Sequence, residues 1–274
     1  MDQKKNTESP SYYNDLEKMT IGELVSNINK EDSIVAGVVN KSLEQVAKLI
    51  KAALVKMKAG GRLFYIGAGT SGRLGILDAS EIPPTYGVRD DLVIGLIAGG
   101  DIAIRKAVEF AEDDRTQAWK DLAGFSINKN DFLVGIAASG ETPYVLGGIK
   151  TAKENGISTG SIVCNAGSSI AQASDYPIEL LTGPEFVTGS TRMKAGTAQK
   201  MVLNMISTSL MIQLGKVKGN KMIEMRLSNS KLWHRATGIL SHELGLSREA
   251  AEELIQKHKS IKKAIKAFQT QNSK

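Results

Sequence analysis

The sequence predicts an α/β protein: a three-layer sandwich with a mainly parallel, doubly wound sheet and helical extensions at its N- and C-terminal ends. Two observations predict it. Short, continuously apolar runs recur through the first two thirds of the chain, and helix-like stretches separate them. Strands that are apolar on both faces are typical of a parallel sheet covered by helices on either side. The strand-like runs are residues 62–66, 92–98, 132–138, 157–164 and, more weakly, 176–181.

Helices are predicted between and around these strands. Residues 1–18 are polar and predict a loosely packed arm, after which Thr20 and Glu23 have the spacing of a capping box. Apolar residues then recur at helical spacing from 38 to 57. The other helix-like stretches are 70–80, 101–113, 142–155 and the segment from 197 to the end, which breaks near 215–220. We therefore predict an N-terminal arm and helix (1–45), a sheet domain (46–218) and a C-terminal helical region (219–274).

The composition excludes several classes of protein. The 274 residues are 42% hydrophobic and 23% charged, which is close to the globular average and excludes a disordered or fibrous chain. The single cysteine, Cys164, excludes a disulfide framework and indicates a reducing compartment. The polar N-terminus does not have the pattern of a signal peptide, and no segment has the unbroken apolar length of a membrane span. We therefore expect a cytoplasmic protein without a membrane partner.

The net charge of +6 is concentrated near the C-terminus. From residue 247 onward, seven Lys or Arg residues stand against three Glu residues, so the rest of the chain is nearly neutral. A nucleic-acid-binding protein would show a basic stripe together with a recognisable reading motif, and the sequence has none. The basic tail is interpreted as a solvated helix face, and no nucleic-acid partner is expected.

Loops rich in glycine and hydroxyl groups carry the candidate binding chemistry. Two of them, 67–72 (GAGTSG) and 137–143 (AASGETP), follow apolar strands, and a third is 188–194 (TGSTRMK). In an open parallel sheet, ligands collect at the carboxyl ends of strands, close to helix N-termini. The N–H groups at such a helix start, together with Ser and Thr hydroxyls, attract anions. The two strand-to-helix loops therefore predict one shared phosphate site, although turn and capping roles would explain either loop alone.

The first loop also fits the dinucleotide pattern G-x-G-x-x-G through Gly67, Gly69 and Gly72. The acidic residue that this pattern requires about 20 positions later would fall near Asp90, before the second strand instead of after it. Ser71 beside a second hydroxyl-rich loop favours a phosphomonoester over a pyrophosphate. A nicotinamide-dependent dehydrogenase is therefore a distant alternative.

Longer runs around these loops resemble the sugar-isomerase (SIS) domains and, over nearly the whole chain, the N-acetylmuramic acid 6-phosphate etherase family. The runs are 67–87, 95–100, 135–145 and 183–200, and 185–194 is also similar to the non-enzymatic glucokinase regulatory protein. The resemblance implies a SIS-type domain that binds a phosphosugar, a homodimer and no cofactor. It also implies that Ser71, Ser139 and Thr142 hold the phosphate. The neighbouring residues expected to complete the pocket are Gly72, Gly140, Ser190, Thr191 and Lys194.

The resemblance further implies a reaction and two catalytic carboxylates. The ether between C3 of the sugar and its D-lactyl group is cleaved by elimination and water addition, which gives N-acetylglucosamine 6-phosphate and D-lactate. Glu81, in the run DASE, matches the family's acid, and Glu112, in the run AED, matches its base. On the helix predicted at 101–113, Glu112 lies at the edge of an apolar stripe, where partial shielding from water suits a base. A solvated acidic helix end is the alternative.

Other residues leave alternatives open. If 70–80 is one helix, Glu81 lies about 15 Å from its phosphate end, so we expect a site shared between two subunits unless glycines shorten the helix. Arg192 and Lys194 are candidates for the lactyl carboxylate, or surface ion pairs. No metal is expected, because the histidines lack ligand spacing. The alternative functions are a non-catalytic phosphosugar-binding regulator and an aldose–ketose phosphosugar isomerase.

Overall fold

The computed structural model describes residues 6–227 and 230–272. By its contacts the chain separates into two compact units, each described here by itself. The first consists of Met1–Ala79 with Asp91–Thr208, and the second of Ser80–Asp90 with Ser209–Lys274. The division into residues 1–45, 46–218 and 219–274 stays a prediction.

The first unit is built around a five-stranded sheet in which every neighbouring pair of strands is parallel. The strand order is β2-β1-β3-β4-β5, so β1 lies between the strands that follow it in the chain. The strands are β1 (Leu63–Gly67), β2 (Val93–Ile97), β3 (Phe132–Ala137), β4 (Ser158–Val163) and β5 (Tyr176–Glu179). The apolar runs in the sequence therefore predicted all of these strands. The central strands β1, β3 and β4 are almost wholly buried, whereas the edge strands β2 and β5 are partly exposed, which fits the weaker apolar pattern at 176–181.

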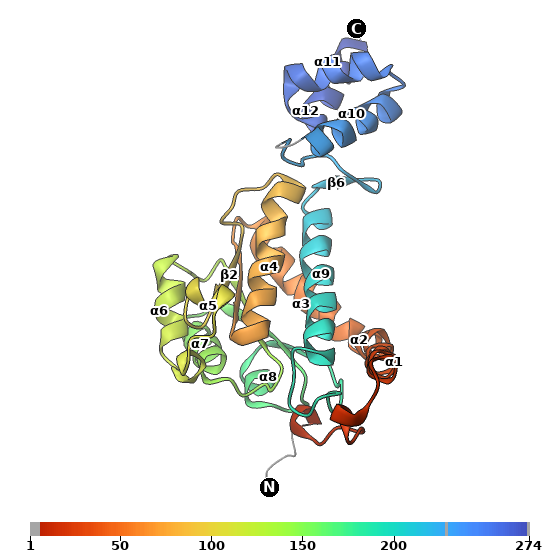
Figure 1. The fold of residues 1–274 in the computed structure, drawn as a ribbon. Helices are drawn as coiled ribbons and strands as arrows, with labels where there is room; N and C mark the ends of the chain where they lie inside the picture. Colours follow the sequence, from red (N-terminus) through yellow and green to blue (C-terminus); the bar gives the residue numbers. More distant parts are fainter. Residues whose placement is uncertain (1–5, 228–229, 273–274) are drawn as a thin grey trace. The chain divides into compact units, whose positions relative to one another are not determined.

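Helices cover both faces of the sheet and complete a three-layer sandwich, as the fold class predicts (Figure 1). One face is covered by α3 (Leu43–Lys58) and α4 (Gly69–Tyr86), with α9 (Lys194–Gln213) beside α4. The other face is covered by α6 (Gln117–Gly124), α7 (Pro143–Glu154) and α8 (Ser169–Ala173), whose apolar side chains share one core with β1 and β3. Close packing depends on glycine: a Cβ on Gly95 of β2 would lie 2.7 Å from Ile76 Cα of α4.

The N-terminal segment is packed, so the expected loose arm is wrong for residues 6–18. These residues form the 3₁₀ turns η1 (Asn6–Glu8) and η2 (Leu16–Lys18). Thr7 is fully buried. Two hydrogen bonds hold it in place: its N–H donates to Asn165 Oδ1 at 3.2 Å, and Asn165 Nδ2 donates to Thr7 Oγ1 at 2.9 Å. An asparagine after β4 thus holds a segment that is distant in sequence.

The helices α1, α2 and α3 precede β1 in the chain. The predicted capping box is confirmed at the start of α1 (Ile21–Asp32), where the Glu23 N–H donates to Thr20 Oγ1 and the Thr20 N–H donates to Glu23 Oε2. The helix predicted at 38–57 is divided into α2 (Val35–Lys41) and α3. The division falls at Ser42, whose hydroxyl donates to the carbonyl of Glu179 at 2.7 Å.

The helix predicted at 101–113 is wrong. Only α5 (Ile102–Arg105) and the 3₁₀ turn η3 (Ala111–Asp113) form there. The chain becomes extended at Lys106 and adopts a left-handed conformation at Phe110. Between them Val108 packs against the backbone at Gly99, where a Cβ would meet the Val108 side chain at 2.8 Å. Tertiary packing has overridden helical spacing in this segment.

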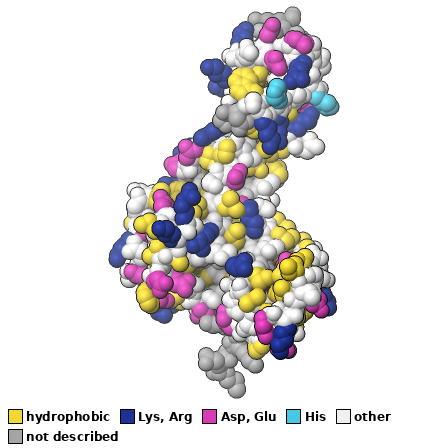
Figure 2. Space-filling view, in the orientation of Figure 1, with side chains coloured by type: hydrophobic (Ala, Val, Ile, Leu, Met, Phe, Trp, Pro, Cys, Tyr) yellow, Lys and Arg dark blue, Asp and Glu magenta, His cyan; other side chains and the backbone are white. Residues whose placement is uncertain are grey.

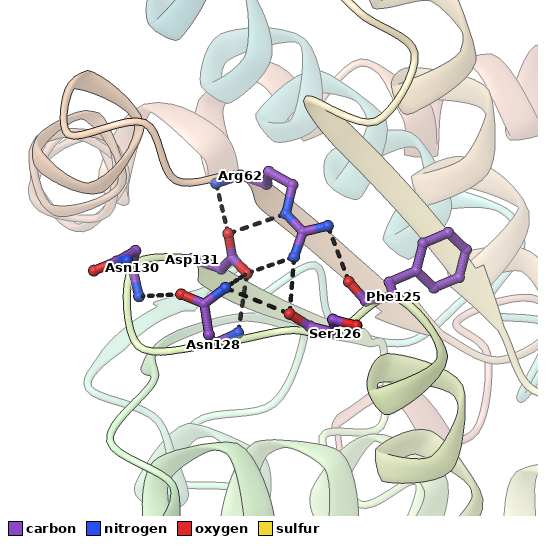
Figure 3. Close-up of polar contacts among 6 residues, drawn as sticks. All are labelled: Arg62, Phe125, Ser126, Asn128, Asn130 and Asp131. Atoms are coloured by element: carbon purple, nitrogen blue, oxygen red, sulfur yellow. Dashed lines mark hydrogen bonds and ion pairs between the residues drawn. The ribbon is translucent and has the colours of Figure 1, made fainter.

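An ion pair joins the amino ends of β1 and β3 (Figure 3). Arg62 Nη2 lies 2.8 Å from Asp131 Oδ2, and the Arg62 backbone N–H donates to Asp131 Oδ1 at 2.8 Å. The same guanidinium donates to the carbonyls of Phe125 and Ser126. The network fixes the edge of the sheet at the amino ends of the strands. Parallel sheets bind their ligands at the opposite edge, at the carboxyl ends.

The second unit has a small core of its own. Its elements are a short hairpin of β6 (Val217–Lys218) and β7 (Lys221–Met222) and the helices α10 (Ser230–Leu244), α11 (Arg248–His258) and α12 (Ile261–Asn272). The hairpin occupies the break predicted near 215–220. The three helices share a buried cluster that includes Ala236, Leu240, Ile255 and Ala264. Among the described helices, none combines the length and apolar character needed to cross a bilayer.

Candidate active site

The sheet topology creates a crevice between β1 and β3. The chain leaves β1 into α4 on one face of the sheet and leaves β3 into α7 on the other face. Because the two helices diverge from neighbouring strands, their N-termini border one crevice at the carboxyl edge, which is where doubly wound sheets bind ligands. The register aligns these strand ends, since Gly67 of β1 pairs with Ile136 of β3.

A cavity of about 340 Å³ occupies this crevice and brings together several of the predicted binding residues. Residues 69–71 at the start of α4 line one side, and Thr142 and Pro143 at the start of α7 line the other. The first N–H groups of a helix have no partner within the helix, so two sets of donors border the same space. The predicted phosphate ligands that line this first cavity are Ser71, Ser139, Thr142 and Thr191.

The hydroxyl groups in the first cavity differ in what they already bind. Thr142 is the N-cap of α7 but makes no side-chain capping bond, and its hydroxyl has no hydrogen-bond partner among the described residues. Ser139 Oγ accepts the N–H of Glu141 at 3.2 Å, which leaves its own proton available. Ser71 donates to Gln199 Oε1 at 2.9 Å. Such hydroxyls can donate to a phosphate oxygen.

Gly72 and Gly140 support the loops and do not line the cavity. A Cβ on Gly72 would lie 2.5 Å from Ile97 Cγ1 and 2.8 Å from the Gly67 oxygen, so glycine lets α4 start close to the sheet. Gly140 has a φ of +71°, and a Cβ there would lie 2.2 Å from Ser168 Oγ. Both glycines shape the backbone that presents the hydroxyls.

The third predicted loop contributes less to the cavity than the first two. Thr191 lines it, whereas Ser190 and Lys194 do not. Lys194 is only 1% exposed, and its ammonium group is paired with the carboxylate of Glu31. Its backbone N–H donates to Glu185, a carboxylate whose pKa is raised by burial. The Lys194 ammonium is therefore committed to Glu31 of α1.

Glu112 lies where the crevice opens. It is exposed on η3 and lines both the first cavity and a second one beside it. The apolar stripe that was expected to shield it does not exist, because the helix predicted at 101–113 does not form. Glu112 is thus a solvated carboxylate at the junction of the two cavities.

Glu81 lies on α4, exposed, and lines neither of the two cavities. The helix runs continuously from Gly69 to Tyr86, so its glycines do not shorten it, and that alternative is wrong. Within α4, Glu81 is ten residues beyond Ser71, or about 15 Å along the axis.

The second cavity, of about 430 Å³, shares Ala68, Gly69, Glu112 and Asp113 with the first. Arg73, on the first turns of α4, lines it and donates from Nε to the carbonyl of Ile104 at 2.9 Å. Arg73 is the only cationic side chain among the described residues that line either cavity.

Glu8 and Arg73 line the cavities, although neither was singled out as a candidate in the sequence. Glu8 reaches the first cavity from the N-terminal segment, and no local pattern connects it to the loops at 67–72 and 137–143, which lie far along the chain. Arg73 has a usable signal, because it follows Ser71 by two residues at the start of a helix whose N-terminus was expected to bind an anion. In the part of the chain that the structure describes, no group of three His, Cys, Asp or Glu side chains is placed to hold a metal ion.

Comparison with known proteins gives the class to which this fold and crevice belong. Residues 45–153 match the family model of the glucokinase regulatory protein N-terminal SIS domain, and residues 108–209 match that of the SIS domain. Residues 219–273 match the C-terminal lid domain of glucokinase regulatory protein. Phosphoheptose isomerases share the fold: that of Neisseria gonorrhoeae superposes with a TM-score of 0.54 at 19% identity, covering 70% of this chain and 98% of its own. The protein is a SIS-domain protein.

Its relatives define the family more narrowly. The N-acetylmuramic acid 6-phosphate etherase of Christiangramia forsetii is 60% identical over 268 residues, which cover 98% of each chain. The protein of the same name from Bacteroides thetaiotaomicron is 55% identical and covers 98% of this chain and 97% of its own. The chain belongs to the N-acetylmuramic acid 6-phosphate etherase family.

Proposed function

We propose that the protein cleaves the D-lactyl ether of N-acetylmuramic acid 6-phosphate, giving N-acetylglucosamine 6-phosphate and D-lactate in the catabolism of cell-wall amino sugars. The observation that carries the proposal is the first cavity. Two helix N-termini and several hydroxyls converge there on space for a phosphate, and Glu112 lies at the rim. The names of the close relatives support the same reaction.

The reaction needs a base and an acid in addition to the phosphate site. In the open-chain aldehyde, the Glu112 carboxylate removes the proton from C2. The electron pair of that C–H bond forms a C2=C3 double bond while the C3–O bond breaks, and the acid protonates the departing lactate oxygen. Water then adds its oxygen to C3, and a proton returns to C2. The net change is the addition of one water molecule across the ether bond.

We also propose that the acid is Glu81 of a second subunit in a homodimer. Glu81 lines neither cavity, and the unbroken α4 carries it about 15 Å past Ser71. A surface suited to a second copy exists on α1. Ile21, Leu24, Val25 and Ile28 follow the spacing of one helical face, no α1 residue is buried, and Ile21 is 81% exposed. Figure 2 shows hydrophobic side chains gathered over α1 and α2.

The chemistry is tested by incubating the protein with N-acetylmuramic acid 6-phosphate in deuterated water. We expect release of D-lactate and one deuterium at C2 of the product. Glu112→Gln should abolish both, whereas Glu154→Gln, at the exposed end of α7, should change neither. Normal turnover by Glu112→Gln would remove Glu112 from the mechanism.

The shared site is tested with mixed dimers. Glu81→Ala and Glu112→Ala chains should each be inactive alone. When the two are unfolded together and refolded as a mixture, about a quarter of the wild-type activity per dimer is expected, because half of the dimers are mixed and each has one intact site. If the mixture stays inactive, Glu81 does not act across a dimer.

A phosphosugar-binding regulator without catalysis is the second candidate, and the matches to glucokinase regulatory protein domains favour it. The match of the lid domain to residues 219–273 also supports our proposed division at 219. A regulator would bind the phosphosugar and release no lactate, and an isomerase would give a ketose phosphate. The lactate assay therefore separates the three functions.

A further inference from the structure

The second cavity carries a feature that the proposed phosphate site does not need. It adjoins the first cavity through Ala68, Gly69 and the junction residue Glu112, and it contains the one cation that lines either space among the described residues. A ligand that fills both cavities thus meets backbone N–H groups and hydroxyls at one end and a guanidinium at the other. Such a ligand would have two separate anionic groups.

The guanidinium of Arg73 is positioned but not neutralised. Its Nε donates to the carbonyl of Ile104 at 2.9 Å, which fixes the side chain between α4 and α5. Neither Nη group has a hydrogen bond or ion pair with a described residue, although Glu109, Glu112 and Asp113 also line the cavity. Those three side chains are exposed, so water screens their charge. Two fork-like donors therefore remain available for a carboxylate, which matches them in shape.

The rest of the wall is small and apolar. Ala98, Ala103, Ala107 and Ala111 line the cavity, together with Val108 and Phe110. A wall of alanines beside one guanidinium suits a group that carries a carboxylate and a methyl on the same carbon. Binding would displace water from the alanine wall and from the methyl group, and the carboxylate would keep the Arg73 guanidinium as its charged partner.

We propose that the second cavity is the subsite for the lactyl substituent, in which Arg73 binds its carboxylate and the alanine wall receives its methyl group. This inference rests on the proposed function. With the phosphate in the first cavity and the lactyl group in the second, the sugar carbons C2 and C3 lie at the junction. Glu112 lines both cavities at that junction. Arg73 thereby replaces Arg192 and Lys194 as the carboxylate ligand, since neither of those residues lines the first or the second cavity and Lys194 is paired with Glu31.

The test separates the two ends of the ligand. In a Glu112→Gln background, which prevents turnover, calorimetry measures binding of N-acetylmuramic acid 6-phosphate, its lactyl primary amide and N-acetylglucosamine 6-phosphate. The acid should bind on the order of 10- to 100-fold more tightly than the amide, because the uncharged amide cannot accept charge-assisted hydrogen bonds from Arg73. Adding Arg73→Gln should remove this preference and leave the affinity for N-acetylglucosamine 6-phosphate unchanged.

Two further variants control for charge and packing. Arg73→Lys keeps the charge without the fork and should retain part of the preference for the acid. Arg105→Gln removes an exposed arginine that lies next to Ile104 and lines neither cavity, and it should retain the full preference. If the preference survives Arg73→Gln, or if that variant weakens both phosphosugars equally, the subsite is wrong. The absence of any preference in the Glu112→Gln background would also refute it.

Failure of the proposed reaction would be distinguishable from failure of the subsite. If the unsubstituted protein releases no lactate but prefers the acid over the amide through Arg73, the catalytic proposal fails and the carboxylate site stands. If lactate is released and acid and amide are cleaved with equal kcat/KM, the reaction stands and the second cavity holds another part of the sugar.

Discussion

The Ser71 hydroxyl donates to Gln199 Oε1 across 2.9 Å, while the amide nitrogen of the same Gln199 is buried without a partner. Ser71 cannot give its single proton to Gln199 and to a phosphate oxygen at once. If the Gln199 side-chain amide rotates by half a turn, its Nε2 donates to Ser71 Oγ and is no longer without a partner. The Ser71 proton is then free to point into the first cavity. Gln199 is thus positioned to control the hydrogen bond of a phosphate ligand.

Substituting Gln199 tests this relationship. Glutamate in its ionised form accepts hydrogen bonds only, so Gln199→Glu keeps the Ser71 proton away from the ligand and adds a negative charge. We expect the Kd for N-acetylglucosamine 6-phosphate to rise on the order of 10-fold or more. Gln199→Met leaves the Ser71 proton free and should bind nearly as well as the wild type. Calorimetry with both variants decides, and equal affinities would show that Gln199 does not influence Ser71.

Thr142 permits a test of the other helix. Its hydroxyl makes no capping bond and has no partner among the described residues, so Thr142→Val should leave the free energy of unfolding almost unchanged. The loss of one hydrogen bond to a charged phosphate should weaken binding of N-acetylglucosamine 6-phosphate by about 1.5–3 kcal/mol. Thr151→Val, on the same helix but outside the cavity, is the control and should bind normally. Unchanged binding by Thr142→Val would place the phosphate elsewhere.

The strands and the glycine- and hydroxyl-rich loops that follow β1 and β3 could be predicted because their signals are local. A continuously apolar run that ends in glycine and hydroxyl residues, as at 63–72, specifies a buried strand, a tight turn and a helix start within ten residues. A parallel sheet then brings such loops to one edge. Ser71 and Ser139 were therefore expected to line the same space, and they do.

The rest of the site depends on contacts between distant segments. The helical spacing of 101–113 predicted one helix, but packing of Val108 at Gly99 divides it and leaves Glu112 on an exposed turn. Glu8 reaches the first cavity because Thr7 is held by Asn165. The ion pair of Lys194 with Glu31 has the same character. No window of the sequence contains both members of these pairs.

The Arg62–Asp131 pair should contribute to stability without affecting binding. Asp131 is 1% exposed and accepts several hydrogen bonds from Arg62, so Arg62→Ala leaves a buried carboxylate without its countercharge. We expect the free energy of unfolding to fall by about 3–5 kcal/mol in urea titrations. The control is Lys48→Ala, which breaks an exposed pair with Glu44 and should cost less than about 1 kcal/mol. Similar losses of unfolding free energy in the two variants would show that the buried pair has no special role. Both variants should bind N-acetylglucosamine 6-phosphate with the same affinity.

Asp78 should make stability depend on pH. It is buried on α4, where the hydroxyls of Tyr65 and Ser207 donate to it at 3.2 Å and Lys200 Nζ lies 3.5 Å away. Burial raises the pKa of Asp78, and these partners offset the effect only in part. Between the pKa of the unfolded chain, about 4, and the higher folded value, the folded state holds a proton that the unfolded state has lost. Protonated Asp78 therefore contributes to the free energy of unfolding in full below about pH 4. This contribution declines as the pH rises through the folded pKa.

Comparison with Asp78→Asn isolates this contribution, because the variant cannot titrate at position 78 and other carboxylates cancel in the difference. The free energy of unfolding of the wild type minus that of Asp78→Asn should decrease as the pH rises from about 4 and then become constant. Urea titrations at half-unit steps of pH measure that difference. The altered hydrogen bonds of asparagine add an offset that is the same at every pH. A difference that stays flat, or that increases with pH, would mean that the partners of Asp78 outweigh its burial.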